Sequence, residues 1–249
     1  MKRFLLRISY DGTNFNGWQS QKKGTTIQQV IETALSGIAK TSVSIVGSGR
    51  TDAGVHAIRQ YAHFDFPIDM DTEQIRLALL SKLPADILVG KVVAVNDDFH
   101  ARFDARERKY RYIIAKEKNP FNRLYKAYFP RKNISLTSMR ECAVYFLGKQ
   151  DFTSFSKHNP DLKNNFCTIK KFEVIQEKSD LNIEITANRF LHNMVRRIAG
   201  TLVNISHSKT NPGIISKLID NKDPGSKLIS TAPACGLYLI DVLYPGLVF

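Results

Sequence analysis

The 249-residue sequence is poor in cysteine and in acidic residues. Its three cysteines lie far apart, without a C-x-x-C motif or a paired histidine, at Cys142, Cys167 and Cys235. This spacing argues against a zinc site or a disulfide framework and fits a reducing compartment. Only 23 Asp and Glu stand against 36 Lys and Arg, so the net charge is +13. Such an excess favours a polyanionic partner, with nucleic acid as the first candidate.

Long hydrophobic runs and nucleotide-binding motifs are also missing. No segment approaches the ~18 apolar residues of a membrane span. The N-terminal sequence passes from two basic residues directly into an alternating pattern, unlike a signal peptide. No G-x-G-x-x-G opens a helix, and no phosphate loop ends in Lys-Ser/Thr. We therefore expect a soluble, cytoplasmic protein. With 43% hydrophobic residues, the chain can build one large or two modest domains.

The first half of the chain predicts the order β-α-β-β-α-β. Thr25 is the expected N-cap of the first helix, with Gln28 completing a capping box. The second helix is expected to start in the segment Asp71–Gln74 and to stop at Pro84. The expected segments are strand 4–9, helix 27–38, strands 43–46 and 60–66, helix 71–83 and strand 87–95.

The second half predicts the same order without repeating the sequence. Its expected segments are strand 110–115, helix 136–147, strands 169–176 and 181–187, helices 190–206 and 212–220, and strand 237–243. The polar, irregular stretches 119–133 and 154–165 are expected to be exposed loops. We therefore predict an α+β fold of two ferredoxin-like halves, residues 1–104 and 105–249, that share a central, mostly antiparallel sheet.

Residues 43–67 combine two strand-like ends with a polar, glycine-rich loop. Three glycines there surround four polar side chains: Gly47, Gly49 and Gly54 around Arg50, Thr51, Asp52 and His56. Glycine loses chain entropy on folding and the polar groups gain no obvious burial, so the loop costs stability. It can present a carboxylate, a guanidinium and backbone N–H groups at one point. Because Gly and Asp are also ordinary turn residues, a long turn is the alternative interpretation.

The loop reads GSGRTDAGVHA over residues 47–57, which resembles the signature of the tRNA pseudouridine synthase A family. Further similar segments are ISYDGTNF (8–15), GWQ (17–19), FHARF (99–103), YRY (110–112), MVR (194–196) and ACGL (234–237). The resemblance implies the pseudouridine synthase fold and the isomerisation of uridines in the tRNA anticodon stem-loop, at tRNA positions 38, 39 and 40. It also implies a homodimer that needs no cofactor and no metal.

The implied reaction breaks the N1–C1′ glycosidic bond, turns the uracil and joins C5 to C1′. It needs one ionised carboxylate as nucleophile or base. The resemblance implies that Asp52 is this catalytic residue and acts as the nucleophile. Whether it attacks C1′ or the base, or removes a sugar proton, stays open at the level of sequence. By its residue type alone, an Asp between Thr and Ala is also an ordinary turn or capping residue.

A carboxylate in a dry pocket stays ionised only when a cation or hydrogen bonds favour its charged form. Arg50 lies in the same loop, and Arg196 lies on the helix expected from residue 190. There Arg189, Asn193, Arg196 and Gly200 are expected to share one helical face. An arginine at the edge of an apolar stripe is also typical of a snorkelling surface residue. The resemblance favours Arg196 as the ion-pair partner of Asp52, with Arg50 shaping the loop and binding RNA.

Tyr110 and Tyr112 share one face of the strand expected at 110–115. Tyrosines on inner faces usually belong to the core, and this applies to Tyr112. The resemblance implies that Tyr110 stacks on the target base, which must leave its stem before the sugar can be reached. His56 and His192 are interpreted as packing or RNA-contact residues. For Trp18 and Phe15 we favour hydrophobic plugs over contacts to RNA.

Two other functional classes fit parts of the sequence. Ferredoxin-like halves with basic stripes also describe a non-catalytic RNA-binding protein, but the aromatic signature of RNA-recognition domains is absent from the sequence. A glycosidase-like hydrolase would need a second carboxylate at a spacing that pairs it with Asp52, and the sequence offers no such partner.

Overall fold

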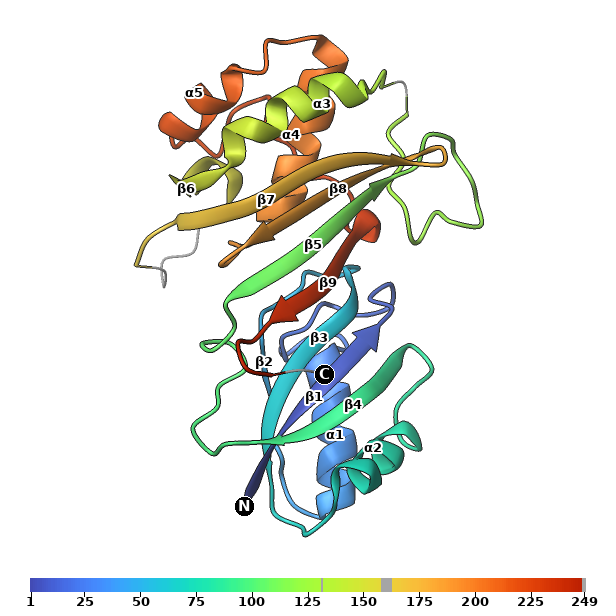
Figure 1. Ribbon diagram of the computed structural model, residues 1–249. Coiled ribbons are helices and arrows are strands. Elements are labelled where there is room, and N and C mark those ends of the chain that lie inside the picture. Colours follow the sequence, from blue (N-terminus) through green and yellow to red (C-terminus); the bar gives the residue numbers. More distant parts are fainter. Residues whose placement is uncertain (131, 158–162, 248–249) are drawn as a thin grey trace. The chain divides into compact units, whose positions relative to one another are not determined.

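A computed structural model describes residues 1–130, 132–157 and 163–247. The described chain forms two compact units, with Met1–Arg106 and Tyr238–Phe249 in unit 1 and Glu107–Leu237 in unit 2 (Figure 1). The predicted α+β class with mostly antiparallel strand pairing is confirmed. The sequence-based boundary assigns the last strand to the second half, whereas its contacts assign residues from Tyr238 onward to unit 1.

Unit 1 follows the β-α-β-β-α-β order that the sequence predicts. Its elements are β1 (Lys2–Tyr10), α1 (Ile27–Ala39), β2 (Val46–Gly47), β3 (His56–Phe66), α2 (Thr72–Leu80) and β4 (Ile87–Val95). The central strand β1 pairs antiparallel with β3 and β4, and β3 also pairs antiparallel with β2. The C-terminal strand β9 (Leu237–Leu243) adds a short parallel pairing to β3 through Tyr238 and Leu239.

Helices α1 and α2 lie on the same face of the unit 1 sheet (Figure 1). The buried residues of α1 recur at helical spacing, and α2 buries two more; they are Ile27, Ile31, Ala34, Leu35, Ala39, Ile75 and Leu79. Such a stripe makes a helix amphipathic, so its burial against the sheet stabilises both elements. The predicted helices therefore form where their apolar faces can be covered.

The starts of the two helices test the capping predictions. The capping box of α2 is present, because Asp71 Oδ1 accepts the Gln74 N–H at 2.8 Å and Gln74 Oε1 accepts the Asp71 N–H at 3.0 Å. The box predicted for α1 is wrong. Thr26 rather than Thr25 is the N-cap and accepts from the Gln29 N–H at 3.3 Å. The Gln28 side chain bonds onward to Glu32 and to the Ile45 carbonyl instead.

Unit 2 has the strand order β5-β8-β7-β6, with antiparallel neighbours throughout. Its elements are β5 (Glu107–Ile114), α3 (Leu136–Ala143), β6 (Gly148–Asp151), β7 (Phe166–Glu177), β8 (Asp180–Ala187), α4 (Met194–Ser208) and α5 (Ile214–Asp220), with short 3-10 turns at Val144–Phe146, Thr153–Phe155 and Ala234–Gly236. Helices α3, α4 and α5 lie on one side of these strands (Figure 1).

Three elements of unit 2 differ from the sequence prediction. The helix expected over 136–147 is α-helical only to Ala143 and continues as a 3-10 turn. Strand β6 was not predicted, because its four residues carry no hydrophobic alternation. The helix expected from Phe190 begins at Met194, since Asn193 has a left-handed backbone with φ of 62°. Residues 131 and 158–162 of the two predicted loops lie outside the described residues.

Across the part of the chain that the structure describes, no helix is both long enough and apolar enough to cross a membrane.

Candidate active site

The glycine-rich loop connects β2 and β3 in unit 1. The predicted strand 43–46 is reduced to Val46–Gly47, and β3 begins at His56, four residues earlier than expected. At the start of the loop the Ser48 N–H donates to the Tyr61 carbonyl at 2.7 Å. The fully buried Gln60 bonds Ser48 Oγ at 2.5 Å and donates to the Gly49 carbonyl at 3.1 Å. One buried amide side chain therefore fixes the entry to the loop.

Thr51, directly before Asp52, is anchored from two sides. Its hydroxyl lies 2.8 Å from the Tyr10 hydroxyl, and its carbonyl accepts the Trp18 N–H at 3.1 Å. Burial raises the pKa of Tyr10, so its hydroxyl stays protonated for this bond. Gly17 permits the close approach: it has φ of 84°, and a Cβ there would lie 2.5 Å from the Thr51 carbonyl oxygen.

Asp52 is half-buried in the turn that follows. Its carbonyl accepts the Val55 N–H at 3.2 Å, and the Gly54 N–H donates to the Phe15 carbonyl at 3.3 Å. Phe15 and Trp18 are 7% and 2% exposed, which confirms that they are hydrophobic plugs. The main chain on both sides of Asp52 is therefore bonded to a buried segment, whereas Arg50 is exposed.

His56 lies at the exit of the loop and is 3% exposed. Its Nδ1 is 3.1 Å from both the Gly12 nitrogen and Asp11 Oδ1. One nitrogen cannot accept from Gly12 and donate to Asp11 at once. Asp11 Oδ1 also accepts from the Thr13 N–H and hydroxyl, so we assign Nδ1 as the acceptor for Gly12. With its ring stacked 4.8 Å from that of Tyr238, His56 packs the base of the loop.

Tyr110 lies on β5 of unit 2 and is 8% exposed. Its ring meets the Phe190 ring edge-on at 5.0 Å between centroids. Tyr112, two residues further along the same strand, is completely buried and donates its hydroxyl to the Pro233 carbonyl at 2.8 Å. The prediction that Tyr112 belongs to the core is confirmed.

Arg196 lies in the first turn of α4 in unit 2 and is half-buried. Its Nε donates to the Ala232 carbonyl at 2.9 Å, and its Nη1 contacts Asn193 Oδ1 at 3.4 Å. The Ala232 N–H returns a bond to the Arg196 carbonyl at 3.1 Å. The plane of the guanidinium is therefore fixed by the segment that precedes β9.

The face of α4 that carries Arg196 differs from the sequence prediction. Arg189 and Asn193 precede the helix and cannot share a helical face with Arg196. Gly200 does share it, and a Cβ there would lie 2.1 Å from the Ser230 carbonyl oxygen. The sequence did not predict that Ala232 supports Arg196. Ala232 contributes only its backbone carbonyl, and every residue type has one.

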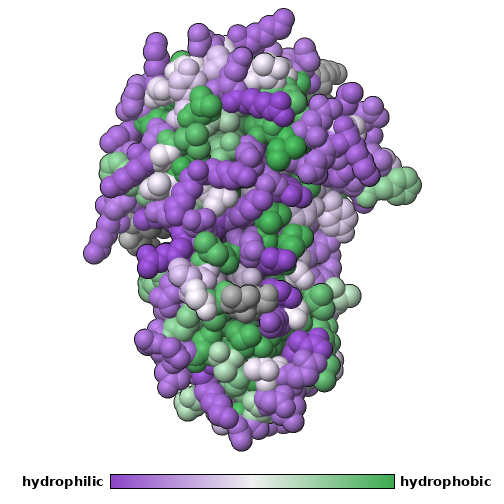
Figure 2. All heavy atoms as spheres, in the orientation of Figure 1, coloured by the Kyte–Doolittle hydropathy of each residue, from purple (hydrophilic) through white to green (hydrophobic). Residues whose placement is uncertain are grey.

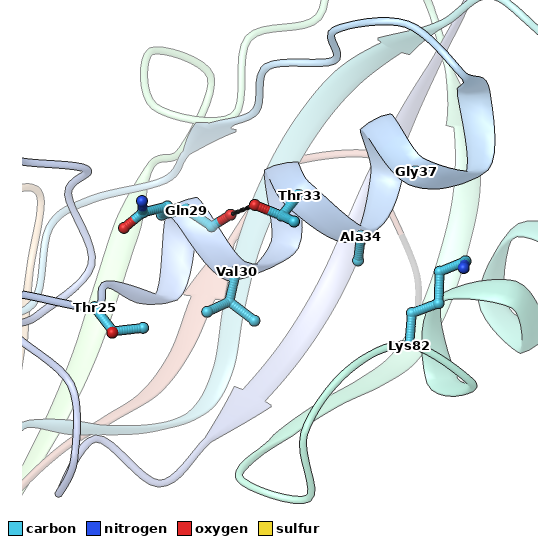
Figure 3. Close-up of a pocket in the computed structure, with 7 residues that line it drawn as sticks. All are labelled: Thr25, Gln29, Val30, Thr33, Ala34, Gly37 and Lys82. Carbon is cyan, nitrogen blue, oxygen red and sulfur yellow. Dashed lines mark hydrogen bonds between the residues drawn. The ribbon is translucent and has the colours of Figure 1, made fainter.

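The predicted site residues thus divide between the units, with Arg50 and Asp52 in unit 1 and Tyr110 and Arg196 in unit 2. A hollow of about 530 Å³ lies along α1 of unit 1, lined by Thr25, Gln29, Val30, Thr33, Ala34, Gly37 and Lys82 (Figure 3). It offers a single titratable group, the Lys82 amine, so it lacks the carboxylate that the predicted chemistry needs. Among the described residues no cluster of His, Cys, Asp or Glu could hold a metal ion.

Comparison with known proteins places the chain in a family. The family model for tRNA pseudouridine synthase matches residues 7–104 and 142–245. The tRNA pseudouridine synthase A of Pseudothermotoga lettingae is 43% identical over 245 residues, which cover 97% of this chain and 99% of the relative. The enzyme of that name from Bacillus licheniformis is 42% identical over 248 residues, which cover 97% of this chain and 99% of the relative. The one from Bacteroides fragilis is 40% identical over 253 residues, which cover 100% of this chain and 99% of the relative.

The fold and these matches define a class, the pseudouridine synthases, which are isomerases that convert uridine to pseudouridine. Within that class, the chain belongs to the tRNA pseudouridine synthase family. The resemblance to the tRNA pseudouridine synthase A family, noted in the sequence, is confirmed over nearly the whole length of the chain.

Proposed function

We propose that this protein isomerises uridines in the anticodon arm of tRNA, with Asp52 as the nucleophile. The observation that carries the proposal is the anchoring of Asp52: the residue is half-buried, and the main chain before and after it bonds to the buried segment around Phe15 and Trp18. A nucleophile must meet its target atom in a narrow range of positions, and a fixed main chain supplies that precision.

The proposed step keeps the composition of the substrate and exchanges one of its hydrogens with water. The Asp52 carboxylate bonds to C1′ as the N1–C1′ bond breaks and the uracil leaves with the electron pair. The uracil turns, and C5 bonds to C1′ as the bond from Asp52 to C1′ breaks and the carboxylate is regenerated. The hydrogen on C5 is then lost to water, and N1 takes up a proton. The net reaction is an isomerisation, in agreement with the class to which the family belongs.

We propose Arg196 as the cation that keeps Asp52 ionised. Its bonds to Ala232 and Asn193 hold the guanidinium plane in one orientation. A fixed fork of N–H donors binds a carboxylate with less loss of side-chain entropy than a flexible ammonium does. Arg50, which is exposed, is assigned to shaping the loop and contacting RNA phosphates.

Tyr110 is proposed to stack on the extruded uracil. The edge-on contact with Phe190 fixes the orientation of the Tyr110 ring, and a fixed aromatic face holds an unstacked base by ~1–3 kcal/mol. The net charge of +13 supports binding of the tRNA backbone. Hydrophilic residues cover much of the face seen in Figure 2. The homodimer, the cytoplasmic location and the tRNA positions modified stay predictions from the resemblance.

The first test is Asp52→Asn, which preserves the shape of the side chain and removes its charge. With tRNA that carries tritium at C5 of uridine, we expect wild-type protein to release tritium into water. The variant should release none above background and still bind tRNA. Asp241→Asn is the matched control. Asp241 lies on β9 and its carboxylate pairs with Arg59 at 3.0 Å, so turnover should persist in this variant. Tritium release by Asp52→Asn at the wild-type rate would remove Asp52 from the mechanism.

A further inference from the structure

The segment Phe99–Asp104 of unit 1 forms a turn that is tied to the sheet at several points. The Ala101 N–H donates to His63 Nδ1 at 3.1 Å, and the Ala101 carbonyl accepts the Tyr244 hydroxyl at 2.5 Å. Arg3 donates to the Phe99 carbonyl at 3.1 Å. Burial lowers the pKa of His63 to about 4, so its ring stays neutral near pH 7 and Nδ1 can accept. The turn is therefore rigidly attached to β3.

A series of aromatic rings leads from this attachment outward. The His63 ring lies 4.9 Å from the His100 ring, and the Phe103 ring stacks on His100 at 4.2 Å with an interplanar angle of 30°. His100 is held in turn, because its Nδ1 accepts from the N–H groups of Arg102 and Phe103 at 3.2 and 3.3 Å. The outermost ring, Phe103, is 74% exposed.

An exposed phenylalanine alone carries no functional meaning, since single apolar residues are common on protein surfaces. Phe121 is such a case: it is 91% exposed, and its ring contacts no other ring within the described chain. Phe103 differs because its ring stacks on the fixed His100 ring, which in turn contacts His63, and because the Arg102 guanidinium lies over the ring, 5.8 Å from its centroid. A pre-oriented aromatic face beside a guanidinium is the arrangement on which unpaired nucleobases stack, with the cation near the phosphate.

We propose that Phe103 is a stacking platform for a second nucleobase of the bound tRNA, in addition to the uracil at Tyr110, with Arg102 contacting the adjoining phosphate. This inference rests on the proposed function, because it takes tRNA to be the ligand. The fixed turn removes most of the ordering cost that a flexible aromatic side chain would incur on binding. The base should be one that is unpaired in the tRNA, since a stacked helix does not expose its base faces.

The test compares tRNA dissociation constants at one fixed salt concentration for four variants. Phe103→Ala and Phe103→Leu should both weaken binding by about 5- to 150-fold, the range that loss of one stacked base produces. Leu keeps the apolar character and removes the aromatic face, so it separates base stacking from hydrophobic docking. Phe103→Trp should retain wild-type affinity, and Phe121→Ala is the matched control and should be unaffected.

A second readout uses fluorescence. The sequence has one tryptophan, Trp18, which is 2% exposed, so the added indole of Phe103→Trp dominates any response to RNA. Addition of tRNA should quench it, because stacked bases quench indole emission. Unchanged affinity in Phe103→Ala, wild-type affinity in Phe103→Leu, or unchanged fluorescence would each overturn the proposal. So would a change in sedimentation of RNA-free Phe103→Ala, which would assign the ring to contact with a second protein chain.

Failure of this inference differs from failure of the proposed function. If wild-type protein releases no tritium from C5-labelled tRNA, the function itself is wrong. If wild-type protein releases tritium but Phe103→Ala and Phe103→Leu bind tRNA as tightly as wild type does, the stacking platform is wrong and the proposed function stands.

Discussion

Asp52 and Arg196, the two charges proposed to act together, are held in place by opposite means. The loop around Asp52 is fixed through its main chain, by the bonds of Thr51, Gly54 and Val55. Arg196 is fixed through its side chain, by Nε and Nη1. Main-chain hydrogen bonds persist when the side chain that they position is replaced. Hydrogen bonds made by the side chain itself are lost when that side chain is replaced. The two residues should therefore respond differently to conservative changes.

The largest expected effect comes from breaking the main-chain anchor with Gly17→Ala. The added Cβ would lie 2.5 Å from the Thr51 carbonyl oxygen at a φ of 84°. The left-handed backbone and the overpacking together should cost ~2–5 kcal/mol of unfolding free energy. Displacement of the loop should lower turnover by more than ~10²-fold. Urea unfolding and tritium release measure the two effects.

Gly37→Ala is the control for Gly17→Ala. Gly37 lies inside α1, and nothing lies within 4 Å of a Cβ built there. Alanine should stabilise this helix by ~0.5–1 kcal/mol without changing turnover. Equal behaviour of the two variants would mean that the approach of Gly17 to Thr51 does not position Asp52.

Next in size is Arg196→Lys, which keeps the charge and removes the anchor. Lysine has no counterpart of Nε, so the bond to the Ala232 carbonyl is lost and the cation becomes mobile. We expect kcat to fall by about 10²-fold, with tRNA affinity near the wild-type value and a loss of ~1 kcal/mol in stability. Arg76→Lys is the control, because Arg76 pairs with Glu73 on the exposed face of α2. It should leave kcat at the wild-type value and change the free energy of unfolding by no more than ~0.5 kcal/mol. A wild-type kcat in Arg196→Lys would contradict the anchoring argument.

The sequence predicted the elements whose burial pattern is strong. The apolar stripe of α1 and the run in β4 gave the correct segments, because periodicity reports directly on which side chains can be buried. The end of α3 and the start of α4 were misplaced, since local backbone geometry decides them. At Asn193 that geometry is a positive φ, which Asn adopts more readily than most residues, but its presence in the sequence does not by itself specify that conformation.

The candidate residues came from the loop motif, whereas their supports could not be read from the sequence. Gln60, which bonds to Ser48 and Gly49, looks like any polar residue in a strand. Ala232 acts through its carbonyl alone. Both depend on contacts between segments far apart in the chain, and one sequence does not encode which distant backbone atom will be near. The same holds for the assignment of the last strand to unit 1.

The smallest expected effects come from a matched pair of buried hydroxyls, Tyr10 and Tyr112. Burial raises the pKa of both. Tyr10 bonds Thr51, next to Asp52, and Tyr112 bonds the Pro233 carbonyl, next to Ala232. Replacing either by Phe removes the hydroxyl with its hydrogen bonding, to Thr51 and Gln60 for Tyr10 and to Pro233 for Tyr112, and should cost about 1 kcal/mol of stability.

Their effects on turnover should differ, because the two anchors differ. In Tyr10→Phe the Trp18 N–H still holds the Thr51 carbonyl, so tritium release should stay within about twofold of the wild-type rate, less than 0.5 kcal/mol in the barrier. In Tyr112→Phe the segment whose Ala232 carbonyl accepts the hydrogen bond from Arg196 Nε loses a neighbouring restraint, and release should slow by about fivefold, near 1 kcal/mol in the barrier. Equal slowing in both variants at equal stability would show that the loop of Asp52 depends on its side chains as much as Arg196 does, and that the contrast between the two anchors does not hold.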